Sequence, residues 1–229
     1  MRRFAHALEY LDRPVPRADR DASLADIDRL NGFGGYALTW RALQRLATRV
    51  PAARPLLVVD VGGGRGDFAR RVIRDAAHRG RAVRVVVVDR DADLLASAAC
   101  RSRGQVTVVR ADATALPFRA GAADVVTMSL TLHHLEPAAA VTSLREMRAI
   151  ARLGVVINDL LRTPLSLALV WLATRVVARH WISRHDGPLS VRRAYSPDEL
   201  RALAEQAGLP TPRVDRYPWL GRLLAVIDA

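Results

Sequence analysis

A cluster of glycines follows an apolar run about a quarter of the way along the chain. The run contains Asp60 and ends at Val61, and a helical pattern starts at Asp67. The turn between them holds Gly62, Gly63, Gly64 and Gly66. Glycine permits a tight turn and lets a ligand touch the backbone, and the N-terminus of the next helix offers unpaired N–H groups. The segment therefore predicts a ligand-binding turn.

The spacing of these glycines excludes two common phosphate-binding motifs. Counted from Gly62, the dinucleotide fingerprint G-x-G-x-x-G requires a glycine at position 67, which is Asp67. A P-loop requires Gly-Lys-Ser/Thr, and the chain contains no lysine. The turn is thus expected to bind a different kind of ligand.

Acidic and histidine residues follow the later apolar runs. Asp89 and Asp112 each come after a valine-rich run, the adjacent His133 and His134 come after the next, and Asp159 ends the last. In an open parallel sheet the carboxyl ends of the strands meet at one edge, where ligands bind. We expect these side chains to gather near the glycine turn.

The apolar runs alternate with helical patterns. The strand candidates are residues 56–59, 83–88, 106–109, 124–128 and 154–157, with two final strands at 214–217 and 223–227. Helical patterns occupy residues 67–78 and 138–151. Uninterrupted Val/Ile/Leu runs are typical of strands buried on both faces, and their alternation with helices indicates βαβ units. We predict an α/β fold: a doubly wound, Rossmann-like, seven-stranded and mostly parallel sheet with helices on both faces.

The flanking segments predict additions to this core within a single domain. Ser23 and Asp26 resemble a capping box at the start of a helix. An apolar helix over 164–179 is followed by a polar stretch over 183–190, and Ser196 begins a further helix that ends at Gly208. The expected segments are a helical cap (1–50), broken at 31–36, a ligand-binding core (51–162), an insertion (163–195) and a part that completes the sheet (196–229).

Composition narrows the class of protein. The 229 residues are 50% hydrophobic with a single cysteine, which excludes disorder and a disulfide scaffold and fits a reducing, cytoplasmic setting. No apolar signal core follows the N-terminus, and the longest apolar run is too short to span a membrane. The net charge of +12 comes entirely from scattered arginines, which argues against a nucleic-acid partner and leaves contact with a membrane surface open. The oligomeric state is not indicated.

The glycine turn and the acids after it resemble the motifs of class I S-adenosylmethionine (SAM)-dependent methyltransferases, strongly over residues 50–162. The resemblance implies SAM as cofactor and S-adenosylhomocysteine (SAH) as product, and no metal. It implies that Asp89 holds the ribose hydroxyls and that Asp112 and Ala113 contact the adenine. The implied cofactor-binding residues are Asp60, Gly62, Gly63, Gly64, Gly66, Asp89, Arg90, Asp112, Ala113 and Ser129.

The residues after the fourth strand favour one branch of this family. The sequence Leu132-His133-His134-Leu135 resembles the small-molecule branch, which includes ubiquinone/menaquinone C-methyltransferases and natural-product methyltransferases. The Asn/Asp-Pro-Pro-aromatic motif of DNA and many RNA or protein N-methyltransferases is absent there. The catalytic lysine of the 2′-O-RNA branch is absent as well, because the chain has no lysine.

Three residues are candidates for catalysis. His133 is the preferred base or polar anchor, since a neutral imidazole can take the proton of a phenol or hydroxyl near pH 7. His134 is second, and Asp159 could bind substrate or orient the base. The alternative for the histidines is packing or capping of the next helix, and for Asp159 a structural cap.

Residues of the insertion are candidates for the substrate site. His185 and Arg192 could line its mouth, or the segment around His185 could be a solvated loop. Trp171 lies on the apolar helix, which could be a substrate lid, a core helix or an interfacial membrane helix, in that order of preference. A lid implies an apolar, phenolic or polyketide-like substrate.

The leading hypothesis is a SAM-dependent methyltransferase that acts on a small, largely apolar metabolite, at a hydroxyl oxygen, in natural-product biosynthesis. A C-methyltransferase for a quinone-like or polyketide substrate is the nearest alternative. An RNA methyltransferase, suggested only by charge, and a non-catalytic SAM-fold interaction protein are the others.

Overall fold

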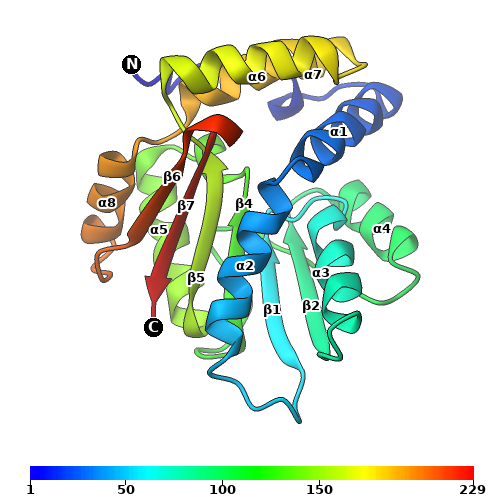
Figure 1. Cartoon of the computed structure of the whole chain (residues 1–229), viewed down its shortest axis with the longest axis vertical. Coiled ribbons are helices and arrows are strands. Elements are labelled where there is room, and N and C mark those ends of the chain that lie inside the picture. The colour runs from blue at the N-terminus through cyan, green and yellow to red at the C-terminus, as the bar shows by residue number, and fades with distance from the viewer.

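The computed structural model describes all 229 residues and contains one seven-stranded sheet. The strand order is β3-β2-β1-β4-β5-β7-β6, and only β7 runs antiparallel to its neighbours β5 and β6 (Figure 1). The strands are β1 Leu56–Val61, β2 Val83–Asp89, β3 Thr107–Arg110, β4 Ala123–Ser129, β5 Ala151–Leu160, β6 Arg213–Tyr217 and β7 Arg222–Asp228. The predicted fold class is confirmed, and the two final strands form the antiparallel edge.

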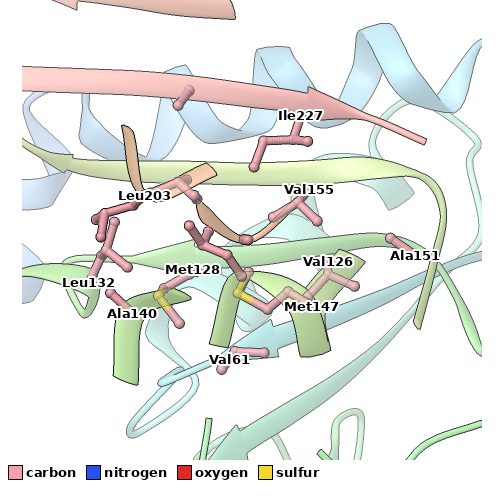
Figure 2. Close-up of a cluster of buried hydrophobic side chains, with 14 of the residues drawn as sticks. Val61, Val126, Met128, Leu132, Ala140, Met147, Ala151, Val155, Leu203 and Ile227 are labelled. Carbon is pink, nitrogen blue, oxygen red and sulfur yellow. The ribbon is translucent and has the colours of Figure 1, made fainter. Parts of the chain in front are cut away.

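Helices pack on both faces of this sheet. The helices are α1 Arg17–Gly32, α2 Gly35–Ala47, α3 Asp67–Ala77, α4 Ala92–Arg101, α5 Pro137–Ile150, α6 Pro164–Val176, α7 Trp181–Arg193 and α8 Pro197–Gln206. One hydrophobic cluster joins α2, α3 and α4 to one face, and a second joins α5 and α8 to the other. Figure 2 shows the second cluster, where Met128 and Val126 of β4 meet Met147 of α5 and Ile227 of β7.

The central strands are apolar because helices cover them on both sides. Six of the seven residues of β4 are buried, and β5 is buried continuously from Gly154 to Leu160. Burial of a valine or isoleucine side chain contributes about 1.5–3 kcal/mol. This core holds the carboxyl edge of the sheet in a fixed place.

A layer of helices, called the helical cap from here on, covers that carboxyl edge; it includes helices from residues 163–195 as well as from the N-terminal part. It consists of α1, α6, α7 and the 3-10 turn η1 Tyr10–Asp12, which lie together at the top of Figure 1. The expected helix start at Ser23 is wrong, because α1 begins at Arg17 and Ser23 lies in its middle. The Ser23 hydroxyl is within 2.9 Å of Ser183 on α7, and Asp26 accepts from the backbone N–H groups of Arg179 and His180. These side chains join α1 to α7 instead of capping α1.

The polar stretch at 183–190 is helical, and the solvated-loop alternative for it is wrong. It lies within α7, with Pro188 inside the helix. Asp186 is 4% exposed and accepts from the backbone N–H groups of Tyr10 and Leu11, at 3.0 and 3.1 Å. The polar residues of this segment therefore hold the N-terminal turn η1.

Other local predictions are confirmed. The chain breaks between α1 and α2 at Phe33 and Gly34. Ser196 caps α8 in a capping box with Glu199, and Gly208 follows the helix with φ +71°. None of the helices has the length and hydropathy of a membrane-spanning segment.

Candidate functional site

A cavity of about 810 Å³ lies between the carboxyl edge of the sheet and the helical cap. One part of its wall is the glycine turn with the ends of β2 and β3, and the other is the cap with the end of β4 and the start of β7. Apolar residues of the cap, among them Leu24, Ile27, Leu30, Leu169, Val170 and Ala173, line the space. This position matches the expected ligand site of an open parallel sheet.

The glycine turn leaves no room for larger residues. Gly62 has φ +68°, and a Cβ there would lie 2.4 Å from Thr131 Cγ2. A Cβ on Gly63 would lie 2.7 Å from Asp60 Oδ2. Gly64, with φ +53°, lines the open side, where its N–H donates to Asp89 at 2.9 Å. Glycine is required here because side chains from neighbouring segments leave no space for a Cβ on one side of the turn, while the cavity lies on the other side.

Asp60 supports this turn from a buried position. It is 1% exposed, and Thr127 donates a hydrogen bond of 2.8 Å to Oδ1. Burial, with a smaller contribution from the charge of Asp89, raises the pKa of Asp60 to about 7. Asp60 therefore holds a proton over much of the acidic range.

Asp89 faces the cavity from the end of β2. Its two oxygens accept from the N–H groups of Gly64 and Asp91, at 2.9 and 3.0 Å, and burial raises its pKa. Asp91, not Asp89, caps α4. Since each carboxylate oxygen can accept more than one hydrogen bond, Asp89 keeps capacity for a ligand.

All but one of the other predicted cofactor residues face the same cavity. Arg90, Asp112, Ala113 and Ser129 line the cavity, and the buried Ser129 hydroxyl has no partner. Asp112 uses Oδ1 to accept from Thr114, which leaves Oδ2 for a ligand. Gly66 does not line the cavity. It precedes α3 with φ +68° and packs against Ala98.

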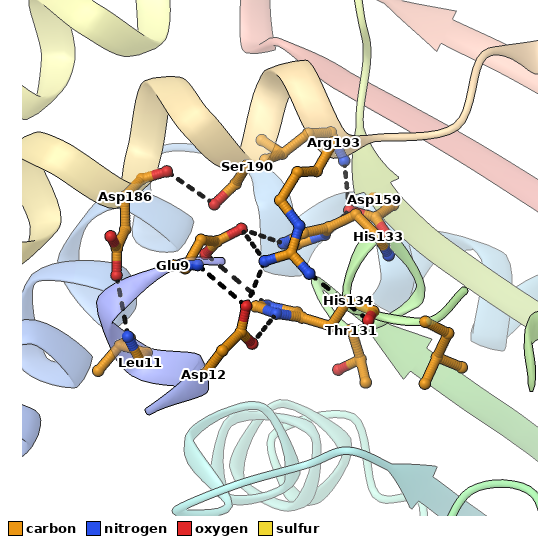
Figure 3. A network of polar contacts seen from close by, with 12 residues as sticks. Glu9, Leu11, Asp12, Thr131, His133, His134, Asp159, Asp186, Ser190 and Arg193 are labelled. Atoms are coloured by element: carbon orange, nitrogen blue, oxygen red, sulfur yellow. Dashed lines mark hydrogen bonds and ion pairs between the residues drawn. The ribbon is translucent and has the colours of Figure 1, made fainter. Parts of the chain in front are cut away.

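His133 and Asp159 form a buried pair at the other end of the cavity (Figure 3). His133 lies in the 3-10 turn η2 Leu132–His134 after β4, and Asp159 lies near the end of β5. The Nδ1 atom lies 2.7 Å from Asp159 Oδ1, and the backbone N–H of His133 donates to Oδ2 at 3.0 Å. Burial works to raise the pKa of Asp159, but the contacts with His133 hold it below its usual value. His133 lines the cavity, whereas Asp159 lies behind it.

His134 belongs to a second group of charged residues. Its Nδ1 lies 2.7 Å from Asp12 Oδ1. Arg193 contacts both Asp12 and Glu9, the latter at 3.1 Å. Burial raises the pKa of Glu9, which is 3% exposed. Glu9, Asp12 and Arg193 could not be predicted as part of this site, because nothing in the local sequence pattern indicates that the N-terminal turn meets the histidines.

Glu9, His133 and His134 are also the residues that could hold a metal ion. Their ligand atoms all lie within 4.8 Å of one another. The Nε2 atoms of the two histidines lie 3.7 and 3.9 Å from Glu9 oxygens. The guanidinium of Arg193 on the same carboxylate already supplies positive charge there.

The structure does not bring the predicted substrate residues into the cavity. His185, Arg192 and Trp171 are absent from its lining, and the His185 side chain is 50% exposed. Trp171 and Arg192 line a separate hollow next to Phe4, on the outer side of α6. The same helix turns Leu169, Val170 and Ala173 toward the cavity, as expected of a lid.

Comparison with known proteins agrees with this geometry. Residues 58–154 match the family described as "Methyltransferase domain". A ubiquinone/menaquinone biosynthesis C-methyltransferase UbiE from Sinorhizobium fredii is 30% identical over 106 residues, which cover 44% of this chain. The match spans 40% of that relative's length.

Solved structures share the fold. The plantazolicin methyltransferase BpumL in complex with SAH has a TM-score of 0.71 at 11% identity, covering 93% of this chain and 90% of that one. A putative O-methyltransferase from Nostoc punctiforme has a TM-score of 0.66 at 17% identity, covering 99% and 64%. The glycine turn, the strand order and the match over residues 58–154 agree with one another: the core of this chain is similar to the methyltransferase domain, and the chain has the fold of SAM-dependent methyltransferases.

Proposed function

We propose that this protein transfers a methyl group from SAM to a hydroxyl oxygen of a small, largely apolar acceptor. The observation that carries the proposal is the His133–Asp159 pair, because His133 lines the same cavity as the glycine turn and Asp89 and is held from behind by Asp159. A hydroxyl acceptor needs a group that takes its proton, and this pair supplies one.

The residues at the glycine turn fit SAM. The carboxylate of Asp89 suits the two vicinal hydroxyls of a ribose, because a charged acceptor forms strong hydrogen bonds. Asp112 Oδ2 and the backbone of Ala113 are available to the amino group and ring of adenine. When bound, SAM supplies an electrophilic methyl group on a sulfonium sulfur.

His133 is arranged to act as the base. Because Nδ1 donates to Asp159, Nε2 is left as the proton acceptor. In the proposed step the acceptor oxygen forms a bond to the methyl carbon, the carbon–sulfur bond breaks, and the acceptor proton moves to His133 Nε2. Asp159 is a positioning residue that also stabilises the imidazolium. The apolar walls from α1 and α6 favour an acceptor with an apolar body.

Methyl transfer to carbon is the second candidate. The curated relative is named a C-methyltransferase. An acidic carbon acceptor also loses a proton, so His133 would serve that reaction in the same way. NMR of the methylated product distinguishes the two, because an O-methyl and a C-methyl group have different carbon chemical shifts.

The experiment combines a binding and a transfer measurement. Calorimetry with SAH tests the cofactor site, and methyl-tritiated SAM with a panel of naphthols and phenols tests transfer. We expect His133→Asn to lower kcat at least 100-fold with unchanged SAH affinity, since Asn keeps a donor to Asp159 but removes Nε2. His185→Asn is the matched control, because its imidazole lies outside the cavity, and its activity should stay near wild type. Failure of SAH to bind, or full activity in His133→Asn, would contradict the proposal.

A further inference from the structure

Arg222 is a buried arginine in the wall of the cavity. It is the first residue of β7, where it pairs with Leu160 of β5 and Tyr217 of β6. It is 7% exposed and lines the cavity. In the register of β5 and β7, Arg222 lies opposite Leu160, the residue after Asp159.

Arg222 differs from the other buried arginines of the chain. Four arginines are less than 10% exposed: Arg65, Arg162, Arg193 and Arg222. Arg65 pairs with Asp67 at 3.0 Å, Arg162 with Glu199 at 2.7 Å, and Arg193 with Glu9 and Asp12. Arg222 has no carboxylate within 4.0 Å.

The contacts of the Arg222 guanidinium are incomplete. One terminal nitrogen donates to the Asn31 side chain at 2.7 Å, and the other is buried without a partner. Asp159 is close enough to favour the charged form, but its oxygens are occupied by His133 and the backbone. Desolvation lowers the pKa of Arg222 to about 10. A buried cation without a counterion destabilises a fold unless a ligand supplies the opposite charge.

We propose that Arg222 binds an oxyanion of the methyl acceptor, a carboxylate or phenolate on an otherwise apolar molecule. This inference rests on the proposed function, because it assigns the substrate class of the same cavity. A carboxylate or phenolate accepts directly from a guanidinium in charge-assisted hydrogen bonds. With a hydroxyl at His133 and an anion at Arg222, the favoured acceptor is a hydroxyaryl compound that carries a second, acidic group.

The sheet separates Arg222 from the cofactor end. Strands β4 and β5 lie between β1, which leads into the glycine turn, and β7. At about 4.8 Å per strand, the two positions are roughly 14 Å apart across the sheet. Asp89 and Asp112 follow β2 and β3, which lie further away on the far side of β1. Arg222 therefore lies at the end of the cavity formed by β5 and β7, where β5 carries Asp159, and away from the groups assigned to SAM.

The test compares two probes that differ in charge. The affinities of 1-naphthoate and 1-naphthamide are measured by calorimetry with saturating SAH, which keeps carboxylates out of the cofactor site. We expect wild type to bind 1-naphthoate at least about tenfold more tightly. Arg222→Met should bind both probes equally, and Arg222→Lys should lie between.

Thermal unfolding separates this role from a structural one. Arg222→Met is expected to have the same or a higher Tm than wild type, because it removes an unpaired buried charge. Arg162→Met is the matched control. It breaks the ion pair between Arg162 and the half-exposed Glu199, outside the cavity, and should lower Tm while it keeps the preference for 1-naphthoate. The Arg222→Lys variant retains the charge and serves if Arg222→Met does not fold.

The outcomes are distinct. No preference for 1-naphthoate in wild type, or an unchanged preference in both Arg222 variants, would overturn the inference. Weaker SAH binding in Arg222→Met would also overturn it, because it would place the carboxylate of the cofactor at this arginine. Failure of wild type to bind SAH would instead overturn the proposed function.

Discussion

The buried carboxyl of Asp60 predicts an unusual dependence of stability on pH. Its pKa is about 7 in the folded protein, against an ordinary value of 3.8. The unfolded chain therefore loses this proton at lower pH than the folded chain, and the free energy of unfolding falls as pH rises from about 4 to above 7. At about 1.36 kcal/mol per pKa unit, the titration of Asp60 lowers the free energy of unfolding, relative to low pH, by about 1.7 kcal/mol at pH 5 and by about 4 kcal/mol at pH 8.

Replacement of Asp60 by Asn removes this titration and keeps an oxygen that can accept from Thr127. We expect the stability of Asp60→Asn relative to wild type to be about 2.5 kcal/mol more favourable at pH 8 than at pH 5. Urea unfolding followed by circular dichroism at the two pH values measures this difference. The matched control is Asp124→Asn. Asp124 pairs with Arg54 and its pKa is lowered below 3.8, so its contribution is complete above about pH 5 and the loss should be the same at both pH values. An equal effect of Asp60→Asn at both pH values would refute the reasoning.

Two further predictions concern the part of the cavity wall formed by the glycine turn and Asp89, here called the cofactor wall. Gly62→Ala should abolish SAH binding, measured by calorimetry, and lower the free energy of unfolding, measured in urea. The loss of stability should exceed the ~1–2 kcal/mol of left-handed backbone strain, because the new Cβ would also meet Thr131. Gly80→Ala is the control for strain alone, since Gly80 has φ +64° and open space around it. Asp89→Ala should raise the Kd for SAH at least tenfold through loss of a charged acceptor, and an unchanged Kd would remove Asp89 from the cofactor site.

The sheet and the cofactor wall could be predicted from the sequence because their signals are local. Each strand is an unbroken apolar run, and the glycine turn lies within a few residues of Asp60. The acceptor end could not be predicted in this way. Its contacts join His134 to Asp12 across 122 positions and Arg193 to Glu9 across 184 positions. No periodicity encodes such pairs. Ser23 and Asp26 show the same limit, since side chains suited to a helix cap bind another helix instead.

Arg222 illustrates a different limit. Strand-end acids after parallel strands follow the chain direction, so their common edge can be inferred from the order of elements. Because β7 runs antiparallel, it is its first residue that reaches the same edge. No sequence pattern distinguishes an arginine at the start of the last strand. Arg222 stands out only in the structure, where it is buried without a carboxylate partner.

The contacts of the N-terminal turn, which carries Glu9 and Asp12, cost more entropy to form than the contacts of the glycine turn. The hydrogen bond that shapes the cofactor wall, from Gly64 to Asp89, closes a loop of 25 residues, whereas the Arg193–Glu9 contact closes one of 184. By the logarithmic dependence of closure entropy on length, the longer loop costs about 2 kcal/mol more to close. The N-terminal turn is thus expected to form last and to open first, whereas the His133–Asp159 contact closes a loop of only 26 residues. A bulky apolar molecule can then enter by release of this first turn while the cofactor wall stays intact.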